Sequence, residues 1–244
     1  MLPAHSILIL VLAVLFSNSV STVTGFGTSV LALPFCTMVL GVHTAVPLVA
    51  LISMSSAIYM TLREHRQVQW LMLGAILAWG AIGFLFGNLG YHFLPMRYLK
   101  LGAGMFVICL AVHTAWRLYH AKSRRPWNPV AGRCLLVVAG LLQGALAVGG
   151  SLFAAYAHRA LHRKGESRAT LFALWIVFNA TFLVSYFGGR DHSAKVLLLG
   201  LWCAPGAAAG IWLGQRIHHW ASERVFQGIV AATLFAAGVS LILK

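Results

Sequence analysis

Two glycine-rich interruptions of apolar sequence carry the residues best suited to bind a ligand. The first is Ser21-Thr22-Val23-Thr24-Gly25-Phe26-Gly27-Thr28-Ser29, and the second is Gln143-Gly144-Ala145-Leu146-Ala147-Val148-Gly149-Gly150-Ser151. Glycine lets a ligand approach the main chain because it has no Cβ atom, and the hydroxyls can donate hydrogen bonds. A helix that begins directly after each interruption would aim free N–H groups and the positive end of its dipole at the ligand. The expected chemistry is therefore recognition of an anion.

The glycines could instead serve only to pack helices together, which is common in transmembrane segments. A binding site is favoured because the interruptions recur at equivalent places. A shift of 122 residues, from Ser29 to Ser151, superimposes the two and sets Ser21 opposite Gln143 as the hydrogen-bonding side chain that precedes each. The residues we expect to bind substrate are Ser21, Gly25, Gly27, Thr28, Ser29, Gln143, Gly149, Gly150 and Ser151.

The composition indicates that these interruptions lie in a membrane. Of the 244 residues, 60% are hydrophobic and 9% are charged, whereas charged residues make up ~25% of ordinary soluble domains. Non-helical backbone at membrane depth is stable only where protein or water surrounds it, so each interruption implies a polar site. We expect an all-α integral membrane protein, with the lipid bilayer as its surroundings.

The expected architecture is two repeats joined by a basic hinge. Apolar segments occur at residues 6–23, 29–42, 44–62, 70–94 and 101–118, and again at 134–146, 151–161, 170–187, 196–213 and 226–243. They predict eight to ten helical segments, with a broken or re-entrant helical hairpin opening each repeat. The second hairpin, counted over residues 134–157, has the length of two half-crossings at ~1.5 Å per residue. The proposed divisions are a first transmembrane repeat at 1–119, a cytoplasmic hinge at 120–131 and a second transmembrane repeat at 132–244.

A second alignment supports an internal duplication. Gly83 and Gly87 match Gly206 and Gly210 after a shift of 123 residues, and both pairs have the small-xxx-small spacing that lets helices approach closely. Basic residues in and beside the hinge predict that it faces the cytoplasm. Counting spans in both directions then gives the repeats opposite senses in the membrane, as in many secondary transporters.

Polar side chains inside later spans are candidates for lining a transport pathway. Ser53 and Ser56 lie in the 44–62 run, and Asn179 and Thr181 lie in the matching 170–187 run. Such side chains more often hydrogen-bond one helix to another, contributing about 0.6 to 2 kcal/mol. The same two interpretations apply to Asn18 and Asn88.

Other features narrow the classes of function. The net charge of +14 comes from basic residues scattered over several short loops, so a nucleic-acid partner is not expected. No metal or cofactor is predicted, because the cysteines are isolated, and no Walker-type phosphate loop is present. The acidic residues all lie in loops or at span ends, which leaves His43, His92 and His113 as candidates for any proton coupling.

The chain resembles the TauE/SafE-type sulfite exporters, also called toluene-sulfonate uptake permeases. In that family each half opens with a GxGGG-like break, typically followed by a proline. Gly25-Phe26-Gly27-Thr28-Ser29 with Pro34 matches the first break, and Ala147-Val148-Gly149-Gly150-Ser151 matches the second. Thr28, Ser29 and Ala147 depart from the glycines of the pattern, and no proline follows Ser151. The resemblance implies secondary export or uptake of sulfite, thiosulfate or organosulfonates across the cell membrane, without ATP.

Alternative functions stay open at this level. Paired broken helices also build channel filters, so an anion channel is the first alternative. An intramembrane enzyme with Ser151 as nucleophile and His92 or His113 as base is another, although neither histidine has a recognisable partner motif. A membrane scaffold without transport activity is the third. We expect a non-enzymatic secondary transporter of a small anion, and the sequence leaves open whether it forms a homo-oligomer.

Overall fold

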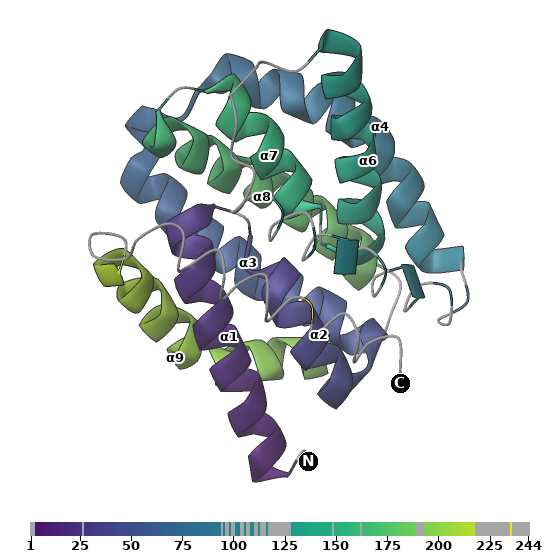
Figure 1. Cartoon of the computed structure of the whole chain (residues 1–244). Helices are drawn as coiled ribbons and strands as arrows, with labels where there is room; N and C mark the ends of the chain where they lie inside the picture. Colours follow the sequence, from purple (N-terminus) through teal and green to yellow (C-terminus); the bar gives the residue numbers. More distant parts are fainter. Residues whose placement is uncertain are drawn as a thin grey trace.

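Every regular element in the described part of the chain is helical (Figure 1). The computed structural model describes residues 3–25, 27–93, 128–147, 149–161, 163–188 and 193–217, with a few isolated residues elsewhere. The predicted spans at 101–118 and 226–243, and most of the predicted hinge at 120–131, fall largely outside the described residues.

The described helices agree with the predicted number. They are α1 (Ala4–Thr24), α2 (Ser29–Leu40), α3 (Val42–Glu64), the 3-10 turn η1 (His65–Gln67), α4 (Trp70–Phe93), α6 (Pro129–Leu146), α7 (Gly150–Ala160), α8 (Lys164–Phe187) and α9 (Ser193–Ile217). Among these, α1, α3, α4, α8 and α9 contain stretches long and apolar enough to cross a membrane. The chain is therefore an all-α, multi-pass membrane protein.

Helix α6 begins earlier than the sequence indicated. It starts at Pro129, five residues before the expected Cys134 and inside the last part of the predicted hinge. Asn128 caps the helix, because its side-chain oxygen accepts a hydrogen bond from the Val130 N–H at 3.0 Å, and proline suits the first helical position. The 18 residues of α6 extend ~27 Å at ~1.5 Å per residue, which is more than the half-crossing expected for this arm.

The helices of the two halves pack in matching pairs. The most extensive contacts join α4 to α6 and α1 to α9 (Figure 1). Exchanging α1 with α6, α2 with α7, α3 with α8 and α4 with α9 converts each of these pairs into the other. The same exchange converts the contact of α1 with α2 into that of α6 with α7, and it leaves the contact of α3 with α8 unchanged. This pattern is expected of a duplicated chain, while the sense of each half in the membrane stays a prediction.

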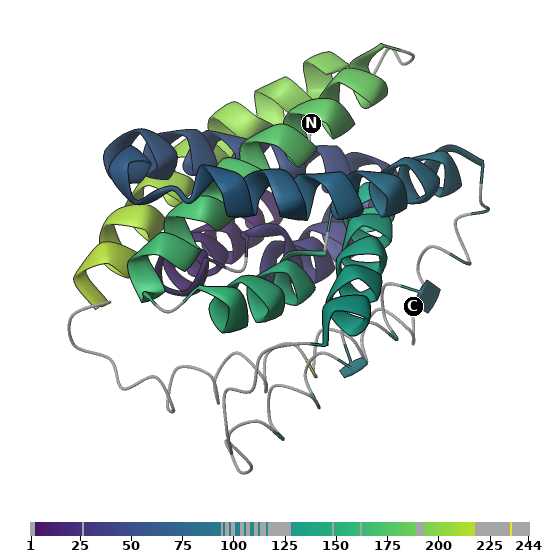
Figure 2. The same cartoon turned by 90° about the horizontal axis from the view of Figure 1, so that it is seen from above.

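Glycine makes the matching contacts close. A Cβ on Gly83 or Gly87 of α4 would overlap a backbone carbonyl of α6, and a Cβ on Gly206 or Gly210 of α9 would overlap one of α1. The two small-xxx-small pairs found in the sequence therefore pack equivalent helix pairs. Figure 2 shows α6 (teal) and α9 (light to yellow-green) on opposite sides of the molecule when viewed from above.

The core lies around α3 and α8. Helix α8 contributes a run of buried side chains, among them Leu171, Leu174, Trp175, Phe178 and Phe182, each at most 3% exposed. Phe153 of α7 stacks on Phe178 with a ring-centroid distance of 5.3 Å. These contacts fix the middle of α8 against the shorter helix that follows the second interruption.

Candidate functional site

Both glycine interruptions form turns in which one helix ends and another begins. Helix α1 ends where Gly25 adopts a left-handed φ of 72° and its N–H donates to the Ser21 carbonyl at 2.7 Å. Helix α6 ends where Ala147 adopts a φ of 56° and its N–H donates to the Gln143 carbonyl at 2.9 Å. A left-handed residue that closes the last turn is a common helix ending. The alignment of Ser21 with Gln143 is therefore present in the backbone.

The two helices expected after the interruptions start where the sequence indicated. Helix α2 begins at Ser29, directly after Thr28, and α7 begins at Gly150, directly after Gly149. Neither Thr28 nor Gly149, the residue before each start, caps the helix with a side-chain hydrogen bond, so the first N–H groups keep capacity for other partners. Each start also carries the partial positive charge of the helix dipole.

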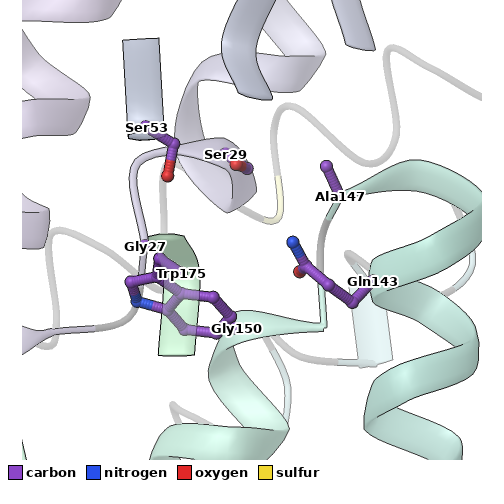
Figure 3. Close-up of a pocket in the computed structure, with 7 residues that line it drawn as sticks. All are labelled: Gly27, Ser29, Ser53, Gln143, Ala147, Gly150 and Trp175. Atoms are coloured by element: carbon purple, nitrogen blue, oxygen red, sulfur yellow. The ribbon is translucent and has the colours of Figure 1, made fainter. Parts of the chain in front are cut away.

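A narrow void lies between the two interruptions (Figure 3). It is lined from both halves by Gly27, Ser29, Ser53, Gln143, Ala147, Gly150 and Trp175. The first residues of α2 and α7 thus border one shared space. The space is narrow in this conformation, so the lining residues must move apart to admit an anion.

The void lies halfway along the two central helices. Ser53 is at the middle of α3, which runs Val42–Glu64, and Trp175 is at the middle of α8, which runs Lys164–Phe187. Both helices contain apolar stretches long enough to cross a membrane. A site midway along such helices corresponds to the depth at which secondary transporters bind substrate.

An amide side chain anchors each interruption. The Asn18 Oδ1 atom of α1 accepts hydrogen bonds from Thr28 Oγ1 at 3.1 Å and from Ser56 Oγ of α3 at 2.6 Å. The Gln143 Oε1 atom of α6 accepts from the Gly149 N–H at 3.1 Å, and Gln143 Nε2 donates to Asn179 Oδ1 of α8 at 3.2 Å. Ser56 and Asn179 therefore hold helices to the interruptions, and neither lines the void.

The unused hydrogen-bonding capacity near the second interruption is capacity to donate. Ser151 Oγ and Asn179 Nδ2 have no hydrogen-bond partner among the described residues, and both are buried. Among the described residues, the other buried side-chain atoms found without a hydrogen-bond partner are Thr61 Oγ1 of α3 and Asn88 Oδ1 of α4. An unpaired buried polar group costs about 1 to 3 kcal/mol. The side-chain amide oxygens of Asn18, Gln143 and Asn179, in contrast, already accept hydrogen bonds from within the protein.

Trp175 lines the void but was missed by the sequence analysis. Its Nε1–H donates to the Gly25 carbonyl at 3.2 Å, and its ring lies beside Gly27 in Figure 3. A tryptophan in the middle of an apolar span is typical of a packed core residue, so its type gave no signal. Its position did, because Trp175 follows Ser53 by the same 122 residues that superimpose the two interruptions.

Six other predicted residues are not among those found to line the described void, namely Ser21, Gly25, Thr28, Gly149, Ser151 and Thr181. Thr181 is on an exposed face of α8 and donates to the Val177 carbonyl at 2.9 Å, so it is not part of the lining. Gly149 packs against the Ala139 carbonyl of α6. Among the histidines considered for catalysis or proton coupling, His113 and the side chain of His92 fall outside the described structure.

Polar contacts close both ends of the α3 and α8 pair. At the C-terminal end of α3, Glu64 forms an ion pair with Arg168 of α8. The Glu64 side chain is 11% exposed and the Arg168 side chain is 16% exposed. Arg168 also donates to the Thr22 carbonyl, which lies within the first interruption, at 3.3 Å. At the opposite end, the Tyr91 and Tyr186 hydroxyls donate to the His43 carbonyl at 3.5 and 3.3 Å. The void lies between these two layers along the helices.

Comparisons with known proteins agree with a membrane transporter. The family model described as sulfite exporter TauE/SafE matches residues 10–241. The chain is also 28% identical over 183 residues to a protein of Comamonas testosteroni described as "Probable inner membrane transporter protein TsaS", covering 73% of this chain and 74% of that protein. No solved structure matches the chain.

Proposed function

Since the chain belongs to the sulfite exporter TauE/SafE family, we propose that it is a secondary transporter of sulfite, thiosulfate or a small organosulfonate. In this proposal it works by alternating access in the cell membrane. The description of its relative from Comamonas testosteroni as a probable inner membrane transporter supports transport and that location. The observation that carries the proposal is the shared void, because the N-termini of α2 and α7 both border it midway along α3 and α8.

The lining suits an anion with several acceptor oxygens. In the described structure the void is lined by glycine, alanine, hydroxyl, amide and indole groups, and none of these is charged. Helix N-termini each stabilise an anion by about 0.3 to 2 kcal/mol, and Ser29 and Ser53 add hydroxyl donors. Binding without a buried cation leaves the anion weakly enough held to be released, which a transporter requires.

The contacts at the two ends of α3 and α8 suit alternating access. We infer that a substrate passes when the layer of Glu64 and Arg168 or the layer of Tyr91 and Tyr186 opens. Inverted repeats allow the two halves to exchange conformations, so that one layer opens while the other closes. The exchange of helix contacts between the halves supports this proposal.

Flux through reconstituted liposomes tests the function. Purified protein is expected to give saturable uptake of labelled sulfite, and unlabelled sulfite trapped inside is expected to accelerate that uptake by counter-transport. Protein-free liposomes are the control. Unitary currents in planar bilayers would favour the alternative of an anion channel. Failure to move sulfite, thiosulfate and methanesulfonate under either gradient direction would contradict the proposal.

A further inference from the structure

We propose that Trp175 sets the maximum size of the anion that this protein transports. The inference rests on the proposed function, because it concerns the same void. It assigns to one side chain a selectivity for compact anions over those that carry a bulky apolar group.

The argument begins with two equivalent positions that differ in size. Ser53 and Trp175 are related by the shift of 122 residues, occupy the middle of α3 and α8, and both line the void. The first half contributes a small hydroxyl group there, whereas the second contributes the largest side chain found in proteins. The indole therefore occupies the space that a serine would leave open.

Trp175 is also the only aromatic residue among those found to line the described void. Apart from Gln143, whose amide is bonded at both ends, the other lining residues are glycine, alanine or serine. The Cβ of an alanine at position 27 would lie 3.5 Å from Trp175 Cε2, so the ring edge directly faces the main chain of the first interruption. Substrate size is thus limited on one side by backbone and on the other by the indole.

The indole is held too firmly to move aside. Its Nε1–H donates to the Gly25 carbonyl at 3.2 Å, and its ring meets that of Phe153 edge to face at 5.8 Å. Phe153 stacks on Phe178 at 5.3 Å, and Phe178 stacks on Phe84 of α4 at 5.1 Å. A rotation of Trp175 would break the hydrogen bond and disturb this buried aromatic stack, so the ring acts as a fixed wall.

The test uses sulfonates that carry the same single charge and differ only in apolar bulk. Uptake of methanesulfonate, ethanesulfonate and benzenesulfonate is compared with uptake of sulfite in liposomes containing the wild-type protein, Trp175→Phe or Trp175→Leu. Phe172→Leu is the matched control, because it removes a buried aromatic ring one turn before Trp175 on α8 that neither lines the void nor belongs to the stack of Phe153, Phe178 and Phe84. Wild-type flux is expected to fall along the series. Trp175→Leu is expected to raise the ratio of benzenesulfonate to methanesulfonate flux by about tenfold or more, in keeping with the discrimination that apolar pockets achieve.

Each outcome bears on a separate claim. A wild-type protein that transports benzenesulfonate as fast as methanesulfonate overturns the size limit without any variant. An unchanged flux ratio in Trp175→Phe and Trp175→Leu, or an equal rise in Phe172→Leu, overturns the role of this residue. A wild-type protein that moves neither sulfite nor any sulfonate contradicts the proposed function instead.

Discussion

Replacing Gly27 by alanine separates the role of the void from the stability of the turn. Gly27 has a φ of 85°, where a side chain costs about 1 to 2 kcal/mol. The added Cβ would lie 3.5 Å from Trp175 Cε2, which is ordinary contact, so no steric clash adds to that cost. The variant should therefore fold and insert, with a methyl group placed between two residues that line the void.

The expected result is a loss of transport larger than the loss of stability. A single misplaced methylene in a substrate pocket changes specificity by about 10-fold to 200-fold, so sulfite uptake in Gly27→Ala should fall at least about tenfold. Gly25→Ala is the matched control, since Gly25 has a similar φ of 72° but does not line the void. Alanine is tolerable there, because Ala147 adopts the equivalent conformation in the second interruption.

The pair of variants is measured by thermal unfolding in detergent and by sulfite uptake in liposomes. Both should lose similar stability, while only Gly27→Ala should lose transport. Wild-type uptake by Gly27→Ala would refute the assignment of the void as the substrate site. Equal losses of uptake in both variants would show that the turn conformation, and not the free space, governs transport.

Further predictions concern the contacts that support the site. Gln143→Leu leaves a buried backbone N–H unpaired and should lower the free energy of unfolding by about 1 to 3 kcal/mol; unchanged stability in denaturant unfolding would contradict the anchoring role. Glu64→Gln removes one charge of a part-buried pair and should lower the free energy of unfolding by about 1 to 3 kcal/mol, whereas a double variant with Arg168→Gln should be less destabilised than Glu64→Gln alone. Gly83→Ala should lower the free energy of unfolding by at least about 1 to 3 kcal/mol, because the added Cβ overlaps a backbone carbonyl of α6. Gly74→Ala, which has open space around it, should leave that free energy unchanged or raise it by up to about 1 kcal/mol.

The helix starts and the close helix contact were predictable from the sequence, because they depend on main-chain conformation. Glycine and hydroxyl residues within apolar sequence predicted where α2 and α7 begin. The spacing of Gly83 and Gly87 predicted a close helix contact, although not the partner helix. These features follow from rules that act locally, namely the conformational freedom of glycine and the end of a helix at a left-handed residue.

Side-chain partners were harder to predict, because they depend on how helices face one another. The repeat alignment paired Ser21 with Gln143, and their carbonyls do close equivalent turns. The amide that matches Gln143 in function is nevertheless Asn18, one turn earlier on α1, since residues three apart share a helix face. The start of α6 was missed for a different reason, because the basic residues before Asn128 made the whole stretch resemble a loop.

The most direct test of the central claim is to locate a bound anion. Selenite has the shape and charge of sulfite and scatters X-rays more strongly, so its position can be found by anomalous diffraction from crystals grown with it. The account predicts a single strong peak between Gly27 and Gly150, within hydrogen-bonding distance of the N-terminal N–H groups of α2 and α7. A peak elsewhere, such as beside Arg168, with none in the void would contradict the account.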